Sequence, residues 1–389
     1  MNIAVLGGGP AGAFAAELLA EAGFPTTLLD EKLAWEKPCG GGLTAKALEA
    51  YPFLAAGEAP KRFVDRAVLV APSGARATLR LRRPLAIYSR QVLNGLLLER
   101  ARRAGATVTR DRVTAAVREK GTWRLKGKQD AYAADFCVVA TGARNPLREM
   151  GARMGPADSY IALGYYMPGC QDHIEIQFLA DFEGYIWVFP RSDHLSAGIC
   201  GKLPAAELRR RLEDYLRRRG MALEGATFYC HLLPSLRART FDRSPLAGDG
   251  WAAVGDAAGL VDPITGEGIY YALRSADLLG ACAREGCLDQ YARRAGIELV
   301  KDLRLGAAIS PRFYRGRFLG SGVTTRMVQF CRRSPTFEDL MQDLFAGSQT
   351  YLGLQQRLWR QLGVTLWEIA TGSRRRADRH EPFQISSPV

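Results

Sequence analysis

The first thirty residues constrain the fold of this chain more than any other stretch. A short apolar run at residues 2–6 precedes the glycine sequence GGGPAG, and an apolar segment with helical spacing follows at residues 13–23. A second apolar run covers residues 25–30. A strand, a helix and a second strand within about thirty residues predict a βαβ unit with parallel strands.

The glycine spacing inside this unit predicts a dinucleotide site. Gly7, Gly9 and Gly12 stand where such a site needs a tight turn, a close approach to pyrophosphate and close helix packing. Asp30 ends the second strand, where a carboxylate can accept hydrogen bonds from ribose hydroxyls. The cofactor-binding residues expected here are Gly7, Gly9, Pro10, Ala11, Gly12, Asp30, Glu31 and Lys32.

A second nucleotide motif, VGDAAGLVDPITGEGI, runs from Val254 to Ile269. An apolar strand meets an aspartate, and a glycine-rich loop then enters a helix. The aspartate could hold the hydroxyls of a sugar-alcohol chain, and the helix N-terminus would direct backbone N–H groups at an anionic ring. The cofactor-binding residues expected in this motif are Gly255, Asp256, Pro263, Gly266, Gly268 and Ile269.

The remaining segments alternate between nucleotide-binding and sheet-forming patterns, so we expect an α/β plus β protein with interwoven domains. Strand-like segments cover residues 62–88 and most of 160–246, and the chain becomes mostly helical after the second motif. We expect a Rossmann-like domain at residues 1–61, 89–158 and 247–300, a mixed or antiparallel substrate sheet at 62–88 and 159–246, and a helical region at 301–389.

Composition excludes several classes of partner. The 53 Lys and Arg against 40 Asp and Glu give a net charge of +13, which favours phosphates or acidic lipid surfaces. We expect no nucleic-acid partner, because no recognition helix, zinc finger or RNA-binding motif is present. Arginine triplets at 209–211, 217–219 and 374–376 fit an ordinary solvated surface. The eight cysteines lack paired spacings, so we expect neither a metal site nor a disulfide framework.

The sequence also bears on localisation. It has no charged leader before an apolar segment and no apolar run of membrane-spanning length, so we expect a cytoplasmic protein. Peripheral contact with the inner face of a membrane stays open. The C-terminal segment is expected to be a helical cap, and a membrane-docking face with Trp359 and Trp367 is the alternative.

At this point the sequence resembles the FAD-dependent flavoproteins with the para-hydroxybenzoate-hydroxylase-type fold, over most of the chain to about residue 300. The resemblance implies that the first motif binds the ADP end of FAD and that Asp256 contacts the ribitol. It also implies that Arg90, in YSRQVLNGLLLERA, lies near the flavin phosphates. A solvated arginine at a helix start remains the alternative for Arg90.

Two segments resemble the geranylgeranyl reductases within these flavoproteins. GYIWVFP looks like their YxWxFP motif, which implies that Tyr185, Trp187, Phe189 and Pro190 line a cavity for an isoprenoid. The glycine pair that follows in that family is represented here by Gly198 and Cys200, a partial departure.

The second segment, KPCGGGLT, looks like the loop that lies beside the isoalloxazine ring in the same family. The resemblance adds Cys39, Gly40, Gly41 and Gly42 to the expected cofactor-binding residues. Cys39 is either a proton donor, with Lys37 lowering its pKa, or a small residue filling a tight space. Cys39 and Tyr185 are the candidate catalytic residues, and water is a third possible proton donor.

The resemblance implies reduction of isolated C=C bonds in a prenyl lipid or a related apolar substrate, by a hydride from reduced FAD plus a proton. The electron donor would be NAD(P)H or a reduced ferredoxin-like carrier protein. The alternative is a flavin monooxygenase or halogenase acting on a secondary metabolite. Against it, Thr141-Gly142 stands where the hydroxylases have Asp-Gly, and GYIWVFP matches the halogenase WxWxIP motif poorly. A non-catalytic FAD-binding lipid carrier is a third alternative.

Overall fold

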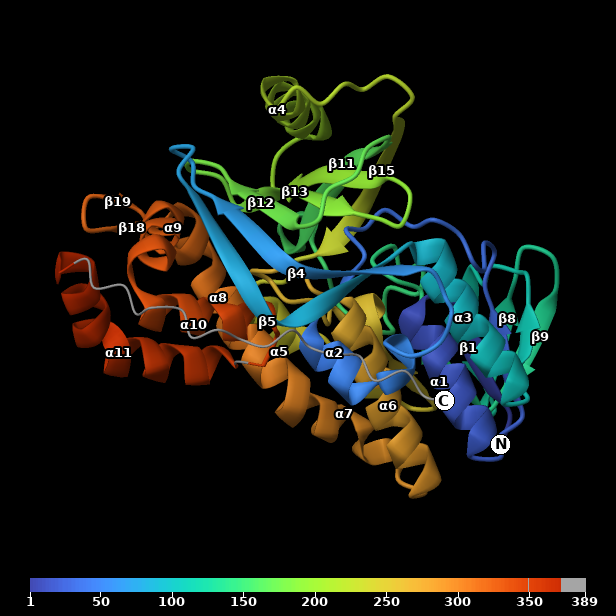
Figure 1. Cartoon of the computed structure of the whole chain (residues 1–389). Coiled ribbons are helices and arrows are strands. Elements are labelled where there is room, and N and C mark those ends of the chain that lie inside the picture. The colour runs from blue at the N-terminus through green and yellow to red at the C-terminus, as the bar shows by residue number, and fades with distance from the viewer. Residues whose placement is uncertain (349, 372–389) are drawn as a thin grey trace, which may run out of the picture.

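A computed structural model describes residues 1–348 and 350–371 (Figure 1). The arginine triplet at 374–376 and the end of the expected helical region, residues 372–389, lie outside the described residues. The described chain contains a six-stranded sheet, an eight-stranded sheet and a three-stranded sheet, together with a series of helices toward the C-terminal end.

The six-stranded sheet is parallel except at one edge, as the βαβ pattern predicts. Its strand order is β16-β17-β10-β1-β2-β6, and only β16 runs antiparallel to its neighbour. The strands are β16 (Ala247–Gly248), β17 (Trp251–Ala253), β10 (Phe136–Val139), β1 (Ile3–Leu6), β2 (Thr26–Leu29) and β6 (Thr107–Thr109). All four residues of β1 and of β10 are buried, which explains why both strands read as continuous apolar runs.

Helix α1 (Pro10–Glu21) lies against this sheet and packs on α3 (Arg90–Arg103) and α6 (Ile269–Arg284). It begins three residues earlier than the sequence pattern indicated, because Pro10 occupies the first helical turn, where the missing N–H of a proline has no cost. Its residues from Pro10 to Leu19 are buried. This burial fixes the glycine turn before α1 against the sheet.

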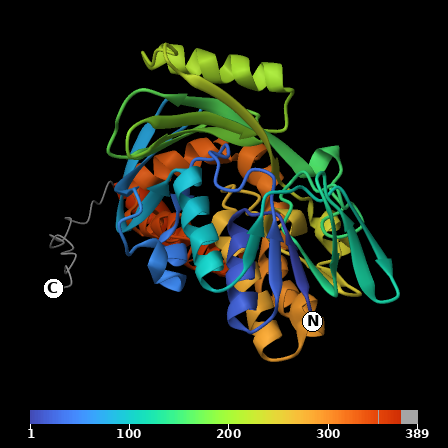
Figure 2. The same cartoon turned by 90° about the vertical axis from the view of Figure 1, so that its right-hand side faces the viewer.

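The eight-stranded sheet has the order β15-β11-β14-β13-β12-β4-β5-β3, and its neighbours are antiparallel except β12 and β4. Figure 2 shows α4 (Ala205–Arg218) covering its outer face. The strands are β15 (Thr227–Pro234), β11 (Ser159–Met167), β14 (Leu195–Gly201), β13 (Gly184–Pro190), β12 (Ile174–Phe178), β4 (Lys61–Val70), β5 (Arg76–Tyr88) and β3 (Gly42–Leu43). The strand β3 brings the CGGG loop onto the edge of this sheet.

A three-stranded sheet that the sequence patterns above did not predict is formed by β7 (Ala115–Glu119), β8 (Thr122–Lys126) and β9 (Ala131–Ala134). Its strands alternate buried or half-buried residues with exposed ones, and a turn with positive φ at Lys120 and Gly121 joins the first two. The alternation and the Lys-Gly turn were readable signals of a hairpin.

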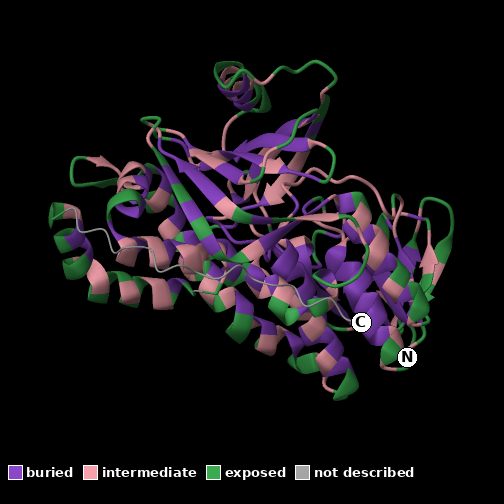
Figure 3. Cartoon of the chain, in the orientation of Figure 1, coloured by how far each residue is buried: buried purple, intermediate pink, exposed green. Residues whose placement is uncertain are grey.

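The helical C-terminal region packs beneath β4, β5 and β12, where it forms an apolar core with them. Figure 3 shows many exposed residues along its last helix, α11, whereas β13 and β14, in the middle of the eight-stranded sheet, are mostly buried. No described helix has the length and hydropathy needed to cross a membrane. The remaining helices and strands are α2 (Ala45–Ala50), α5 (Ala238–Arg243), α7 (Tyr291–Ala295), α8 (Lys301–Arg315), β18 (Arg317–Phe318), β19 (Ser321–Gly322), α9 (Val323–Arg333), α10 (Pro335–Phe345) and α11 (Tyr351–Thr371).

Candidate functional site

Of the three motif glycines after β1, Gly9 has open space beside its Cα, whereas Gly7 and Gly12 are closely packed. A Cβ on Gly7 would lie 2.3 Å from Ala140 O, and a Cβ on Gly12 would lie 1.8 Å from Gly7 O. A Cβ on Gly9, the N-cap of α1, would meet no atom within 4 Å. The first backbone N–H groups of α1 have no side-chain cap and therefore suit an anionic phosphate.

The carboxylate at the end of β2 is fixed by backbone donors. Asp30 Oδ2 accepts a hydrogen bond from Gly8 N at 2.7 Å, and its Oδ1 accepts from Lys32 N and Leu33 N at 2.8 and 2.6 Å. The side chain of Glu31 instead forms ion pairs on the surface, with Arg112 and Lys128. Asp30 is therefore held by backbone donors at the end of β2, whereas the Glu31 carboxylate is paired with two basic side chains.

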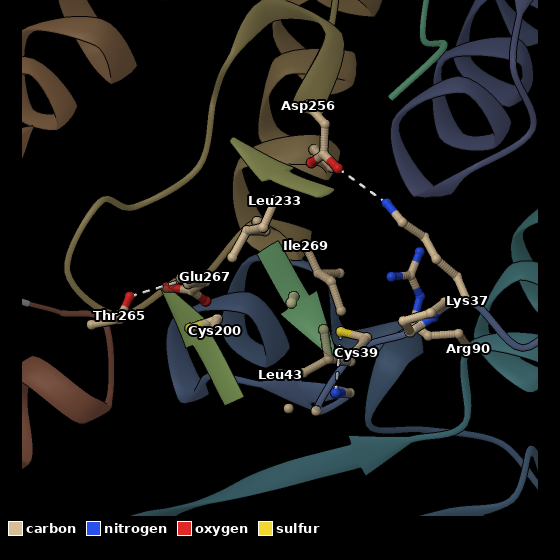
Figure 4. Close-up of a pocket in the computed structure, with 18 of the residues that line it drawn as sticks. Lys37, Cys39, Leu43, Arg90, Cys200, Leu233, Asp256, Thr265, Glu267 and Ile269 are labelled. Carbon is tan, nitrogen blue, oxygen red and sulfur yellow. Dashed lines mark hydrogen bonds and ion pairs between the residues drawn. The ribbon is translucent and has the colours of Figure 1, made fainter. Parts of the chain in front are cut away.

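A cavity connects the carboxyl ends of the parallel strands with the inner face of the eight-stranded sheet (Figure 4). The expected residues that line it come from both halves of the chain: Gly9, Pro10, Ala11, Cys39, Gly40, Gly41, Gly42, Arg90, Gly142, Tyr185, Trp187, Phe189, Asp256, Gly266, Gly268 and Ile269. The expected residues outside its lining are Gly7, Gly12, Asp30, Glu31, Lys32, Thr141, Pro190, Gly255 and Pro263. Parts of both nucleotide motifs and of the aromatic strand thus open onto one space.

One end of the cavity is polar. Lys37 Nζ lies 3.1 Å from Asp256 Oδ2, and Figure 4 shows this pair close to Arg90. Burial alone would raise the pKa of Asp256, but the charge and hydrogen bond of Lys37, together with the charge of Arg90, hold that pKa below its usual value. Lys37 thus pairs with Asp256, whereas the sequence suggested that it lowers the pKa of Cys39. Asp256 lies in a short turn after β17, as the second motif predicts.

Arg90 is buried and incompletely paired, which a surface residue at a helix start would not be. Its Nη2 lies 3.4 Å from Asn94 Oδ1, and its Nε has no hydrogen-bond partner among the described residues. A buried guanidinium N–H without a partner is costly unless a ligand oxygen accepts from it. Arg90, with an unpaired guanidinium N–H, therefore lines the same cavity as the first residues of α1.

The three glycines after Cys39 are required by the protein itself. A Cβ on Gly40 or Gly42 would lie 2.9 or 3.2 Å from the Phe189 ring. Gly41 has a φ of +79°, and a Cβ there would lie 2.1 Å from both Tyr88 O and Arg191 Nη1. Packing inside the protein thus already favours glycine at these positions, through Phe189 for Gly40 and Gly42 and through Tyr88 and Arg191 for Gly41.

The other end of the cavity is aromatic and apolar. Tyr185, Trp187 and Phe189 of β13 point into it from one face of the strand, as their alternate spacing predicts. A Cβ on Gly198 of the neighbouring strand would lie 2.3 Å from the Trp187 ring, so this glycine makes room for the indole. Tyr185 Oη donates a hydrogen bond to Thr265 O, and burial raises the pKa of Tyr185 well above its usual value.

Several functional candidates were missed from the sequence. Glu267 and Thr44 line the cavity and form a hydrogen bond of 2.7 Å across 223 positions of sequence. His231 of β15 also lines it, and burial lowers the pKa of His231 to about 3, so the imidazole is neutral. The GEG sequence in the second motif could have singled out Glu267, whereas no local pattern marks His231.

No group of three or more His, Cys, Asp or Glu side chains in the described part of the chain is arranged to hold a metal ion.

Comparison with known proteins places the chain among flavoproteins. Residues 1–161 match the family model for pyridine nucleotide-disulphide oxidoreductases. The geranylgeranyl diphosphate reductase of a Synechocystis species is 28% identical over 71% of this chain and 73% of its own length. The digeranylgeranylglycerophospholipid reductase of Methanoculleus marisnigri is 29% identical over 72% of this chain and 76% of its own length.

Solved structures agree on the fold. A geranylgeranyl bacteriochlorophyll reductase-like protein of Thermoplasma acidophilum superposes with a TM-score of 0.77 at 20% identity, over 92% of this chain and 98% of that one. The flavin-dependent brominase Bmp2 gives a TM-score of 0.72 at 15% identity, over 94% and 98%. The expected fold class and cofactor, FAD, are confirmed. The chain is therefore an FAD-dependent oxidoreductase that is similar to geranylgeranyl reductases.

Proposed function

We propose that this enzyme reduces isolated C=C bonds in the prenyl chain of a geranylgeranyl-type lipid. The observation that carries the proposal is one cavity that runs from the phosphate-binding end of α1 to the aromatic face of β13. Such a space can hold a flavin against one end of a long apolar substrate. The names of the two reductase relatives support this substrate class.

The residues that line the cavity and the nucleotide turn fit both the ADP part and the ribitol part of FAD. The open position at Gly9 and the unpartnered Nε of Arg90 suit the pyrophosphate, and Asp30 suits the adenosine ribose. Asp256 suits the ribitol hydroxyls, with Lys37 as its present partner. The proposed cofactor-binding residues are those named from the two motifs and the CGGG loop: Gly7, Gly9, Pro10, Ala11, Gly12, Asp30, Glu31, Lys32, Cys39, Gly40, Gly41, Gly42, Arg90, Thr141, Gly142, Gly255, Asp256, Pro263, Gly266, Gly268 and Ile269.

When bound, reduced FAD supplies a hydride, and the protein must orient the alkene, exclude water and provide a proton. Tyr185, Trp187 and Phe189 provide flat apolar surfaces for a polyene, while Pro190 ends their strand. Cys39 Sγ accepts a hydrogen bond from Gly41 N at 3.2 Å, which leaves the thiol proton free to point into the cavity. Tyr185 holds its proton on the Thr265 carbonyl and is the weaker acid candidate.

The domain assignment is part of the proposal. The FAD-binding domain comprises residues 1–61, 89–158 and 247–300, the substrate domain 62–88 and 159–246, and the helical region follows from 301. The chain shows one dinucleotide fingerprint at its N-terminus, so NAD(P)H would reach the flavin transiently, or a ferredoxin-like carrier would deliver electrons.

We also propose peripheral contact with an anionic membrane. Trp359 and Trp367 on α11 are 72% and 60% exposed, and Leu352, Val364 and Leu366 add further apolar surface on the same helix. Exposed tryptophans suit the membrane interface, and the net charge of +13 suits anionic lipid headgroups. This contact would bring the cavity to a lipid substrate.

The test is mass spectrometry of products after incubation of the dithionite-reduced, FAD-loaded protein with geranylgeranyl diphosphate and geranylgeranylated phospholipid, without oxygen. Products heavier by pairs of hydrogen atoms are expected. A flavin halogenase or monooxygenase is the second candidate, because the brominase Bmp2 shares the fold. Oxygenated or halogenated products that form only after air is admitted would replace the reductase proposal by that one.

A further inference from the structure

The polar side chains of the cavity fall into two groups. Lys37 and Asp256 form an ion pair on one side, and Glu267 lies across the cavity from them (Figure 4). Glu267 Oε1 accepts a hydrogen bond from Thr44 Oγ1 at 2.7 Å. Among the described residues, Glu267 takes part in no ion pair, and no hydrogen bond reaches its second oxygen, Oε2. One carboxyl oxygen is therefore held while the other stays free.

Glu267 also lies where the nucleotide motif meets the aromatic strand. Tyr185 Oη donates a hydrogen bond to Thr265 O, and a Cβ on Gly266 would lie 2.8 Å from that hydroxyl oxygen. The loop that carries Glu267 is thus in contact with the wall proposed to hold the alkene. Cys200 and Leu233 line the cavity beside it.

The surroundings of Glu267 favour the neutral acid. Burial raises the pKa of Glu267 to about 7, the negative charge of Asp262 adds to the rise, and Thr44 and Lys46 oppose it. Lys46 Nζ lies 4.1 Å from the centre of the Tyr270 ring and, within the described chain, forms no ion pair with Glu267. The titratable and charged groups that face Glu267 are Asp262, Lys46, Tyr270 and Tyr271.

Thr44 determines which oxygen carries the proton. Its Oγ1 accepts from Ala47 N at 3.4 Å as the N-cap of α2, so its own hydrogen is directed to Glu267 Oε1. When Glu267 is protonated, the acid proton therefore resides on Oε2. Because an apolar substrate would displace water from the cavity, loading the site strengthens the preference for the neutral form.

We propose that Glu267 is the catalytic residue that donates the proton during alkene reduction and that Thr44 positions it. The inference rests on the function proposed above. In this step the Oε2–H bond would break and a C–H bond would form at one alkene carbon as the π bond is lost. A bound reduced FAD would supply the hydride, with its two electrons, for the other carbon, and the Glu267 carboxylate would regain a proton from water.

The first test needs no cofactor. Infrared spectra of the FAD-free protein across pH should show a protonated-carboxyl C=O band that disappears with a midpoint near pH 7. Glu267→Gln should remove this band. The matched control is Glu338→Gln, because burial also raises the pKa of Glu338 but its carboxyl lies outside the cavity lining. A wild-type spectrum without the titrating band, or a band that survives Glu267→Gln, overturns the inference.

The second test measures a single turnover of the dithionite-reduced, FAD-loaded protein with geranylgeranyl diphosphate. Glu267→Gln should retain FAD and slow reduction by roughly 10²- to 10⁴-fold, the usual contribution of a general acid. Glu267→Asp should restore part of the rate, and Thr44→Val should shift the pH profile. The wild-type rate should fall as pH rises through about 7, whereas the profile of the Gln variant should lose that step.

The outcomes separate the two proposals. If wild type and Glu267→Gln reduce the substrate at the same rate, the proton donor is another group. The rate of Cys39→Ser, measured in the same way, then shows whether that group is the Cys39 thiol. If wild type reduces no prenyl substrate, the proposed function fails and this inference fails with it, whatever the infrared spectrum shows.

Discussion

At the scale of single residues, the loop after Cys39 is fixed by contacts within the protein. Gly41 has a positive φ, and a Cβ at this position would lie too close to Tyr88 O and Arg191 Nη1 for a larger residue to fit. The carbonyl of Cys39 accepts hydrogen bonds from Arg191 Nη2 at 2.7 Å and from Ser196 Oγ at 3.2 Å. The loop is therefore positioned before any cofactor binds.

Gly41→Val should abolish FAD retention. Backbone strain together with overpacking should destabilise the loop by roughly 2–5 kcal/mol. The ratio of flavin to protein absorbance after purification measures retention. Gly95→Ala is the control, because its Cβ would meet only Ala34 Cβ, at an ordinary 3.8 Å. Normal FAD content in Gly41→Val would show that the CGGG loop is wrongly placed.

The Lys37–Asp256 pair should stabilise the FAD-free protein. Both side chains are partly exposed, at 20% and 16%, so Lys37→Met should reduce the free energy of unfolding by roughly 1–3 kcal/mol at pH 7. The pKa of Asp256 is lower in the folded protein than in the unfolded chain. The contribution to stability is therefore complete at pH values above the usual aspartate pKa, and it is lost as the pH falls through the pKa of the folded protein. Urea unfolding in a double-mutant cycle with Asp256→Asn measures it, and additive effects would contradict the pairing.

At the scale of elements, Glu36 joins the cavity loop to helix α3. Its carboxylate accepts hydrogen bonds from Ser89 Oγ at 2.6 Å and from the backbone N–H groups of Arg90 and Gln91, both at 3.0 Å. Arg191 lies 3.6 Å from it. One side chain thus caps the helix that carries Arg90 and holds the loop that carries Cys39.

Glu36→Ala should destabilise the protein by about 1–3 kcal/mol, because it leaves the first amides of α3 unpaired. Burial would raise the pKa of Glu36, but the hydrogen bonds from Ser89 and the two amides lower it below its usual value. The contribution of Glu36 to stability is therefore complete at pH values above the usual glutamate pKa and is lost as the pH falls through the pKa of the folded protein. Hydrogen exchange of the Arg90 and Gln91 amides should accelerate. Glu99→Ala, at an exposed site on the same helix, should leave that exchange unchanged; equal exchange in both variants would refute the capping role.

Local patterns predicted the elements well and their long-range partners poorly. The strands β1 and β13 and the helix α3 follow from periodicity within a few residues, whereas α1 begins three residues before its predicted start, at Pro10. The pairing of Lys37 with Asp256 and of Thr44 with Glu267 spans more than two hundred positions. Such contacts depend on how the two sheets meet, and no periodic signal in one segment contains that information.

At the scale of the whole molecule, two sheets share one cavity while the C-terminal helices lie at one end of the fold and the β7–β9 sheet at the other (Figure 1). The exposed tryptophans of α11 lie at the same end as the other C-terminal helices. This arrangement would let α11 contact a membrane while the nucleotide-binding strands stay in solvent.

Replacing both tryptophans, as Trp359→Ser with Trp367→Ser, should weaken binding to vesicles that contain anionic phospholipid without changing FAD content. Each tryptophan contributes apolar area that the interface would bury. Vesicle sedimentation measures the bound fraction. Val117→Ser, an exposed apolar position on β7, is the control at the opposite end. Equal sedimentation of the double variant and wild type would contradict membrane contact through α11.

Anaerobic stopped-flow spectroscopy of the reduced, FAD-loaded protein mixed with geranylgeranyl diphosphate shows whether a prenyl alkene accepts electrons from the flavin. We predict that the absorbance of oxidised flavin returns in the absence of oxygen, at a rate that depends on substrate concentration, because the alkene is the electron acceptor. Flavin that stays reduced with the substrate and reoxidises only when oxygen is admitted would contradict the proposed alkene reduction.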